Sequence, residues 1–231
     1  MAASTRSYHE SCALAHSLDL IGERWALLVV RELLFGPRRF TDLQGRLGAA
    51  SSSVLTDRLQ RLVESGIVER RRLPPPSAAW VYELTEWGTA LQPALVALAQ
   101  WGRLSSSRDA ELPTTPAAIA LSMLVQFDRA KARGLDIVVD LDLDGDRFRA
   151  EVRDERLRVG PSEGRPAPTT VRASVAVFGP LVGAPVSTPA QLTAAGLEIA
   201  GDARAVARLL ATLTRSAGDG LEALARASVG G

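Results

Sequence analysis

Reactive side chains are scarce in this chain and gather near its start. Its 231 residues include two histidines and one cysteine, and the three are His9, Cys12 and His16. A structural zinc ion takes about four nitrogen or sulfur ligands, so the sequence predicts no such metal site. A nucleophile needs a base within hydrogen-bond reach, and the rest of the chain has neither histidine nor cysteine. We therefore expect a binding protein without a cofactor rather than an enzyme.

Four acidic side chains in the second half have the alternate spacing of a calcium-binding loop. They are Asp140, Asp142, Asp144 and Asp146. Leucines separate the first three, and the glutamate that closes such loops as a bidentate ligand is missing. An Asp-Gly pair between alternating apolar residues is a strong signal for a β-hairpin. The pattern favours a hairpin over a metal site.

Polar binding chemistry is concentrated in the stretch SSSVLTDRLQRLVESGIVERRR, residues 51–72. Ser51 suits a helix N-cap, and Leu55, Leu59 and Leu62 form one stripe, so that side should face a core. The hydroxyl and amide groups of the other side lie near the start of the helix, which is where a DNA-reading helix meets base edges. The predicted DNA contacts on this helix are Ser51, Ser52, Ser53, Thr56, Gln60 and Arg61.

Arginines cluster beside this helix although the whole chain is nearly neutral. The net charge is +1, from 27 basic and 26 acidic residues, so bulk charge does not predict nucleic-acid binding. The clusters are Arg38 and Arg39, then Arg70, Arg71 and Arg72. Guanidinium groups bind phosphates through paired donors and release counterions. These arginines are therefore predicted to hold the DNA backbone, with a plain solvated surface as the alternative.

The elements expected around these residues follow the order of a winged helix-turn-helix domain. Apolar periodicity predicts two helices over residues 9–34 with a break at Gly22, then a short helix opened by a capping box of Thr41 and Gln44, then the helix from Ser51. Beyond Gly66, IVERRR and AWVYELT predict a hairpin around PPPSA, and residues 86–103 predict one further helix. This order is typical of DNA-binding winged domains.

Residues 12–102 resemble the HxlR family of bacterial winged-helix transcription regulators. The matching segments are Cys12, LDLIGERW at 18–25, RELLFGPRRFTDL at 31–43, LTDRL at 55–59, ESGIVER at 64–70, YELTEWG at 82–88 and Trp101-Gly102. Where the family usually has an apolar residue followed by Ser-Pro, this chain has Ala50, Ser51 and Ser52, so the operator sequence does not carry over. The resemblance implies a homodimer that binds a near-palindromic site in double-stranded DNA.

Cys12 allows two interpretations. Some relatives in this family use a cysteine at this position to sense oxidants or electrophiles, and the resemblance extends this role to Cys12. A thiol near the start of a helix has a lowered pKa and is reactive where it is exposed. A lone cysteine is also commonly a small buried apolar residue. Thiol redox sensing at Cys12 is one expected input, and inert packing is the alternative.

The second half is predicted to be a separate α+β domain. SSSRDAELPTTPA is polar and contains prolines, so we expect a linker over residues 105–116, between a winged domain over 1–104 and a second domain over 117–231. A helix is expected over 117–132, followed by a mostly antiparallel sheet packed by helices. The predicted strands are LDIVVDLDLDG, DRFRAEVRD, Arg156 to Val159, TTVRASVAVF and LEIAG, before a closing helix from Asp202 to about Arg215.

Residues 136–215 resemble sterol-carrier-protein-like domains. The matching pieces are DLDLDGDRFRAEV and GLEIAGDARAVARLL. The resemblance implies a sheet with helices on one face and an apolar tunnel, so a hydrophobic small molecule is an expected effector. The predicted pocket residues are Ile137, Val139, Phe148, Val175, Phe178, Leu181 and Val182. The alternative is that they fill an ordinary core and the domain serves dimerisation or stability.

No feature of the sequence predicts a membrane partner. No run reaches the roughly 20 apolar residues of a transmembrane helix, and MAASTRSYHE lacks the apolar core of a signal peptide. We expect a cytoplasmic, DNA-binding transcriptional regulator. The alternative is a carrier of lipids or other hydrophobic ligands whose winged domain makes protein contacts.

Overall fold

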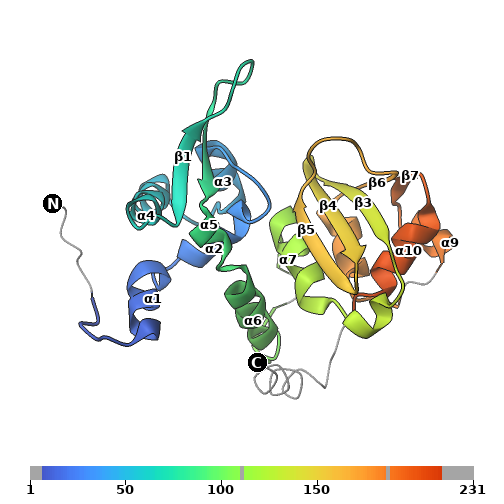
Figure 1. The fold of residues 1–231 in the computed structure, drawn as a ribbon, viewed down its shortest axis with the longest axis horizontal. Coiled ribbons are helices and arrows are strands. Elements are labelled where there is room, and N and C mark those ends of the chain that lie inside the picture. The colour runs from blue at the N-terminus through green and yellow to red at the C-terminus, as the bar shows by residue number, and fades with distance from the viewer. Residues whose placement is uncertain (1–6, 110–111, 186–187, 215–231) are drawn as a thin grey trace. The chain divides into compact units, whose positions relative to one another are not determined.

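Residues 7–109, 112–185 and 188–214 are described in a computed structural model of the chain. The first elements are α1 Ala13–Ile21, α2 Ala26–Leu33, α3 Phe40–Arg46, α4 Ser52–Glu64, β1 Val68–Arg72 and β2 Trp80–Leu84 (Figure 1). The two strands pair antiparallel, and their hairpin projects beyond the helices. The predicted helix-turn-helix with a two-stranded wing is confirmed.

The start of α3 differs from the predicted capping box. The backbone N–H of Arg39 donates to the Asp42 carboxylate at 3.1 Å, so the helix begins at Phe40 and Thr41 lies inside it. Gln44 donates instead to the carbonyl of Ala50 at 2.7 Å. The expectation failed because an aspartate two residues nearer to Arg39 satisfies the first free N–H group.

The helix predicted over residues 86–103 is two helices, α5 Glu86–Thr89 and α6 Gln92–Gly102. Pro93 lies where a continuous helix would need a backbone N–H, and its ring would clash with a carbonyl of the preceding turn, so the chain restarts there. Gly88 allows α5 to approach the start of the wing. A Cβ at Gly88 would lie 2.1 Å from the Ile67 carbonyl oxygen, so a larger residue cannot replace it without a shift.

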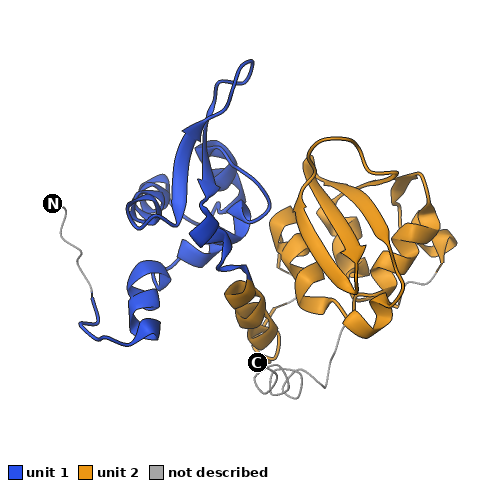
Figure 2. Ribbon diagram, viewed as in Figure 1, with its two compact units in different colours: residues 1–92 blue, residues 93–231 orange. Residues whose placement is uncertain are grey.

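The chain divides into two compact units, residues 1–92 and 93–231 (Figure 2). This division falls at the start of α6, between Gln92 and Pro93, and the domain boundary expected at residue 104 stays a prediction. Of the residues of α6, all of which are described, Leu95 alone is buried. Helix α6 therefore contributes a single buried side chain to the core.

The second unit is built on a five-stranded sheet of order β5-β4-β3-β6-β7. Its strands are β3 Ile137–Leu143, β4 Asp146–Arg153, β5 Arg156–Pro161, β6 Thr169–Ala173 and β7 Glu198–Ala200. β3 and β6 are parallel, and the other neighbours are antiparallel. Asp144 and Gly145 both have positive φ, 50° and 87°, as the predicted Asp-Gly hairpin requires.

Helices cover one face of this sheet. They are α7 Pro116–Gln126, the 3-10 turn η1 Arg129–Ala132, α8 Val175–Phe178, the 3-10 turn η2 Gly179–Leu181, α9 Pro189–Ala194 and α10 Ala203–Ala211. Val139, Leu141, Phe148, Ala150 and Val171 point into the core and are almost fully buried. The alternate residues of the same strands are largely charged, so the second face is polar. The predicted mixed α+β architecture is confirmed.

The segment TTVRASVAVF is only half a strand. β6 ends at Ala173, and Ser174 caps α8 by accepting from the Val177 N–H at 3.3 Å. Asp144 of the β3–β4 turn accepts the Val175 N–H at 2.9 Å. These two acceptors, one local and one distant in sequence, override the strand preference of the valines. The closing helix stops at Ala211, before the predicted end, and residues 215–231 lie outside the described part.

No described helix is both long and apolar enough to traverse a lipid bilayer. The same described residues contain no group of three or more side chains placed to ligate a metal ion.

Candidate nucleic-acid interface

Helix α4 is oriented as its leucine stripe predicts. Leu55, Leu59 and Leu62 are at most 1% exposed, and Ser51 caps the helix by accepting the Val54 N–H at 3.4 Å. The six residues predicted to contact DNA from this helix are all exposed: Ser51, Ser52, Ser53, Thr56, Gln60 and Arg61. Burial of one side therefore fixes the polar side toward solvent.

The polar groups of α4 are occupied by weak contacts within the helix. Ser51 and Ser53 share a hydrogen bond of 3.1 Å, and Thr56 donates to the carbonyl of Ser52 at 2.8 Å. Gln60 donates to Glu64 at 2.9 Å. Such solvent-exposed bonds exchange readily with water or with a ligand. Nothing in this arrangement blocks contact with base edges or phosphates.

Arg38 and Arg39 differ although they are neighbours. The backbone of Arg38 pairs with Tyr82 of β2 through hydrogen bonds of 2.9 Å and 2.8 Å, and its side chain is half-buried. Arg39 is exposed, and its guanidinium donates to the Ser77 hydroxyl in the wing loop at 3.1 Å. Arg39 is thus the better placed of the two to reach a phosphate, while the Arg38 backbone anchors the wing.

The three wing arginines have different surroundings. Successive side chains of a strand point to opposite faces, so Arg70 and Arg72 share one face of β1, and Arg71 lies on the other. Arg71 forms an ion pair with Glu83 of β2. The Arg72 guanidinium donates to the Ala78 carbonyl at 3.0 Å. The pleat therefore leaves two of the three cations without a carboxylate partner among the ion pairs of the wing.

Two residues of this region were missed by the sequence reasoning. Trp80 is exposed, and the guanidinium of Arg70 lies 4.7 Å from the centre of its ring. This cation–π contact holds the arginine in place. Arg58 lies on the buried side of α4 and is itself buried. The helical spacing from Leu55 to Arg58 and Leu62 would have placed Arg58 with the leucines.

Cys12 is exposed and is the N-cap residue of α1. Hydrogen bonds from the backbone of Ala15 and then of Leu14 lower the pKa of its thiol, and the slight desolvation of the sulfur only partly opposes this. Its exposure favours the sensing interpretation over inert packing, and both stay predictions. The geometry meets both conditions for a reactive thiol.

Comparisons with known proteins agree with this geometry. The model of the HxlR-like helix-turn-helix family matches residues 20–110. The HTH-type transcriptional regulator YodB of Bacillus subtilis is 36% identical over 85 residues, which are 37% of this chain and 76% of YodB. The chain belongs to the HxlR family. Its first unit, residues 1–92, contains most of the region that the family model matches.

A second relative and a solved structure are also similar to part of this chain. The HTH-type transcriptional regulator Rv3095 of Mycobacterium tuberculosis is 42% identical over 103 residues. The match covers 44% of this chain and 65% of Rv3095, so the chain spans less than two thirds of that relative. The reduced form of YodB from B. subtilis is a similar solved structure, with 33% identity, 42% of this chain, 97% of that chain and a TM-score of 0.38.

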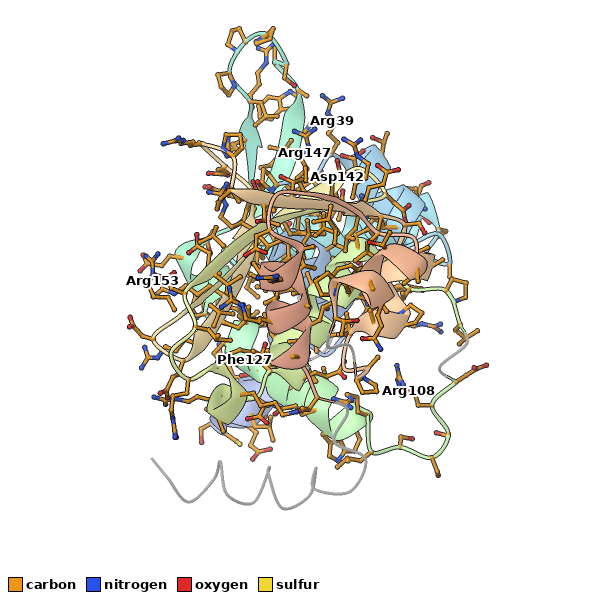
Figure 3. The ribbon with its side chains drawn as sticks, turned by 90° about the vertical axis from the view of Figure 1, so that its right-hand side faces the viewer. Arg39, Arg108, Phe127, Asp142, Arg147 and Arg153 are labelled. Atoms are coloured by element: carbon orange, nitrogen blue, oxygen red, sulfur yellow. The ribbon has the colours of Figure 1, made fainter. Side chains whose placement is uncertain are left out.

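The second unit of this HxlR-family chain keeps the predicted pocket residues inside its core. Six of the seven are buried, and Leu181 is half-buried. An open hollow of about 570 Å³ occurs elsewhere in this unit, lined by Asp142, Asp144, Gly145, Arg172, Ala173, Ser174, Val177, Gly196 and Glu198. Asp142 and Arg147, on neighbouring strands at this end of the sheet, form an ion pair of 3.8 Å, and Arg153 lies farther along β4 (Figure 3). This lining suits polar rather than hydrophobic molecules.

Proposed function

We propose that this HxlR-family protein binds double-stranded DNA as a homodimer and thereby regulates transcription. The observation that carries the proposal is α4 itself, capped at Ser51, with its leucines buried and its hydroxyl and amide side exposed. Arg70 and Arg72 lie beside it on one face of the wing. Ser53 and Thr56 would read base edges, and Arg39, Arg70 and Arg72 would hold phosphates.

Footprinting on DNA upstream of the gene for this protein and its neighbours tests the proposal. We expect a protected, near-palindromic site and an affinity that falls steeply as salt rises, because several phosphates are neutralised. Changing Ser53 or Thr56 should alter the preference between sequences, whereas changing Arg39 should weaken all sequences alike. Absence of salt-dependent binding to any DNA would favour the alternative, a hydrophobic-ligand carrier whose winged domain makes protein contacts.

Dimerisation is supported by uncovered apolar side chains on two helices. Leu14 of α1 is 68% exposed, and Leu98 and Trp101 of α6 are 50% and 65% exposed. Exposed apolar surface of this kind marks interaction sites. A two-fold symmetric partner would cover the same residues on both copies and place two α4 helices on two half-sites.

Two inputs could control DNA binding, and the first is oxidation of Cys12. Support comes from the exposed thiol with its lowered pKa and from the relative YodB, whose solved structures include quinone-bound and diamide-treated forms. Mass spectrometry after mild peroxide or diamide treatment tests this input. An unmodified thiol together with unchanged DNA binding would end it, and Cys12→Ser is the matched control.

The second input is a hydrophobic effector bound by a sterol-carrier-like second unit. The order of the five strands and the cover of one face by helices are compatible with such a domain. Because the predicted pocket residues are buried, an apolar ligand would have to separate packed side chains. Thermal shift and operator binding with fatty acids, sterol-like compounds and aromatic polyketides test this input. Indifference to all of them favours a unit that serves stability or dimerisation.

A further inference from the structure

Arg58 is a buried cation in the helix proposed to read DNA, but it does not face the DNA side. Its nearest carboxylate is that of Glu23, with 3.4 Å between Nη2 and Oε2, and the next is that of Asp57 at 3.8 Å. Its Nε atom is buried without a hydrogen-bond partner. A guanidinium removed from water needs close carboxylates, so Arg58 depends on both Glu23 and Asp57.

Glu23 lies in a corner between α1 and α2 whose backbone is tightly fixed. A Cβ at Gly22 would lie 2.5 Å from the Leu18 carbonyl oxygen, so this position requires glycine. Trp25 has a φ of 78°, which is unusual for a bulky residue, and the Arg24 guanidinium covers its ring at 5.2 Å. The corner thus holds the Glu23 backbone in one place opposite α4.

Asp57 is shared between Arg58 and the exposed Arg61. Arg61 Nε donates to the two carboxylate oxygens of Asp57 at 3.3 Å and 3.1 Å. Glu23, Arg58, Asp57 and Arg61 therefore form one row of alternating charges from the corner to the exposed side of α4. The two arginines compete for Asp57, and Glu23 reduces the demand of Arg58 for Asp57 because it supplies Arg58 with a second carboxylate.

We propose that Glu23 is a positioning residue for DNA binding, which acts through Arg58 and Asp57 on Arg61. While Glu23 holds Arg58, Asp57 remains with Arg61 and restrains it. Without that carboxylate, Arg58 draws Asp57 toward itself, and Arg61 is released to reach a phosphate. The inference rests on the proposed DNA binding, and it adds a residue of the α1–α2 corner that determines how strongly α4 contributes to it.

A double-mutant cycle on the full chain tests the inference. DNA affinity is measured for the unmodified protein, Glu23→Gln, Arg61→Ala and the double variant, on the footprinted site and on an unrelated duplex. We expect Glu23→Gln to tighten binding by about two- to fivefold, the range of exposed ion-pair couplings, and to have little effect when Arg61 is absent. Glu64→Gln removes the same charge from α4 and serves as control, with an equal effect in both backgrounds. Equal effects of Glu23→Gln in both backgrounds would overturn the inference.

A second readout needs no DNA and separates this inference from the proposed function. The NMR signal of Arg61 Nε–H in the free protein reports its bond to Asp57. It should shift toward that of an unpaired arginine in Glu23→Gln but not in Glu64→Gln. Absence of the shift contradicts the relay even where DNA binding is intact, and lack of DNA binding with the shift present contradicts the proposed function alone. In Glu23→Asp, which keeps the charge but shortens the side chain, the Arg61 Nε–H signal should lie between those of the unmodified protein and Glu23→Gln.

Discussion

The nearest partner of each wing arginine determines how freely its guanidinium can bind a phosphate. Arg70 stacks on Trp80, Arg72 donates to a carbonyl, and Arg71 is neutralised by Glu83. A guanidinium that is already paired must leave its carboxylate before it can bind a phosphate, so its net contribution to affinity is smaller. The run of three arginines therefore does not act as three equal contacts.

Single alanine variants should separate these roles. Arg70→Ala and Arg72→Ala should each weaken binding to all DNA sequences and lower the slope of log affinity against log salt by about one unit. Arg71→Ala should change the slope much less. It also leaves Glu83 opposite Glu69 in the hairpin, and like charges directly opposite destabilise a sheet. Fluorescence anisotropy over a salt series measures the slopes.

The variant Glu83→Gln is the control for this series. This change frees Arg71 from its ion pair with Glu83 and removes no cation, so the DNA affinity of the variant should rise. Equal losses for all three alanine variants would contradict the assignment of Arg71.

Sequence reasoning reached some of these residues and not others. Ser51 and the leucines of α4 are fixed by local rules, namely capping and a spacing of 3.6 residues per turn. The pairing of Arg71 with Glu83 depends on the register of the hairpin. The length of the proline-containing loop sets this register, and the sequence alone does not show where that loop begins and ends. The burial of Arg58 depends on Glu23, thirty-five positions earlier in the chain, and no local pattern announces such a contact.

The loop between β5 and β6 is tied across the polar face of the sheet by one ion pair. Arg149 of β4 binds Asp140 of β3 through two hydrogen bonds of 2.8 Å and 3.0 Å. The same guanidinium donates to the carbonyls of Glu163 and Arg165, and the Ala167 N–H donates to Asp140 at 2.8 Å. Two strands and a loop therefore share one cluster of hydrogen bonds.

This cluster predicts a pH-dependent stability. Burial on its own raises the pKa of Asp140, but the hydrogen bonds from Arg149 and Ala167 outweigh it, so the pKa is lowered in the folded protein. A lowered pKa stabilises the fold above the unfolded value, about 3.9, and this stabilisation is lost as the pH falls toward the folded value. Asp140→Asn should cost about 2–4 kcal/mol at neutral pH, and the difference should shrink below about pH 4.

Hydrogen exchange of the β3, β4 and loop amides measures this effect within the full chain. Three of the four tryptophans, Trp25, Trp80 and Trp87, lie in residues 1–92, so hydrogen exchange of the amides in these residues should stay unchanged. Asp142→Asn is the control, since its ion pairs with Arg147 and Arg172 are longer, at 3.8 Å and 3.7 Å. A pH-independent cost of Asp140→Asn would contradict the role of its charge.

At this scale the sequence predicted the hairpin of β3 and β4 and missed the ends of other elements. The pair Asp144-Gly145 predicts its turn from adjacent residues alone. The change from β6 to α8 also depends on Asp144, which accepts the Val175 N–H although it lies far from it in the sequence. The break before α6 was visible in Pro93. The helices and strands themselves were predictable because apolar periodicity and turn residues are local features of the sequence. The residues at which they end were not predictable where a hydrogen-bond partner far along the chain decides them.

For the whole molecule, the predicted division into two domains joined by a linker at residues 105–116 stays a prediction. The polar, proline-bearing segment at 105–116 is the obvious linker by composition, yet the compact units divide between Gln92 and Pro93. Leu95 is the one buried residue among those described in helix α6, and Leu98 and Trp101 are exposed. Such a helix contributes little to the core of one chain, so its apolar residues are better explained by a second copy than by either unit.

Dimer dissociation should therefore follow the loss of the exposed side chains of α6. The double change Leu98→Ser and Trp101→Ser removes two exposed apolar side chains of the kind that anchor interfaces and should convert the dimer to monomer at micromolar concentration. DNA affinity should fall together with dimerisation, because a subunit bound at one half-site no longer keeps a second subunit close to the other half-site. Sedimentation velocity over a concentration series measures the association. Leu112→Ser is the matched control, because Leu112 is as exposed as Trp101, at 65% each, but lies outside α1 and α6. A dimer that survives the α6 changes unaltered would place the interface elsewhere.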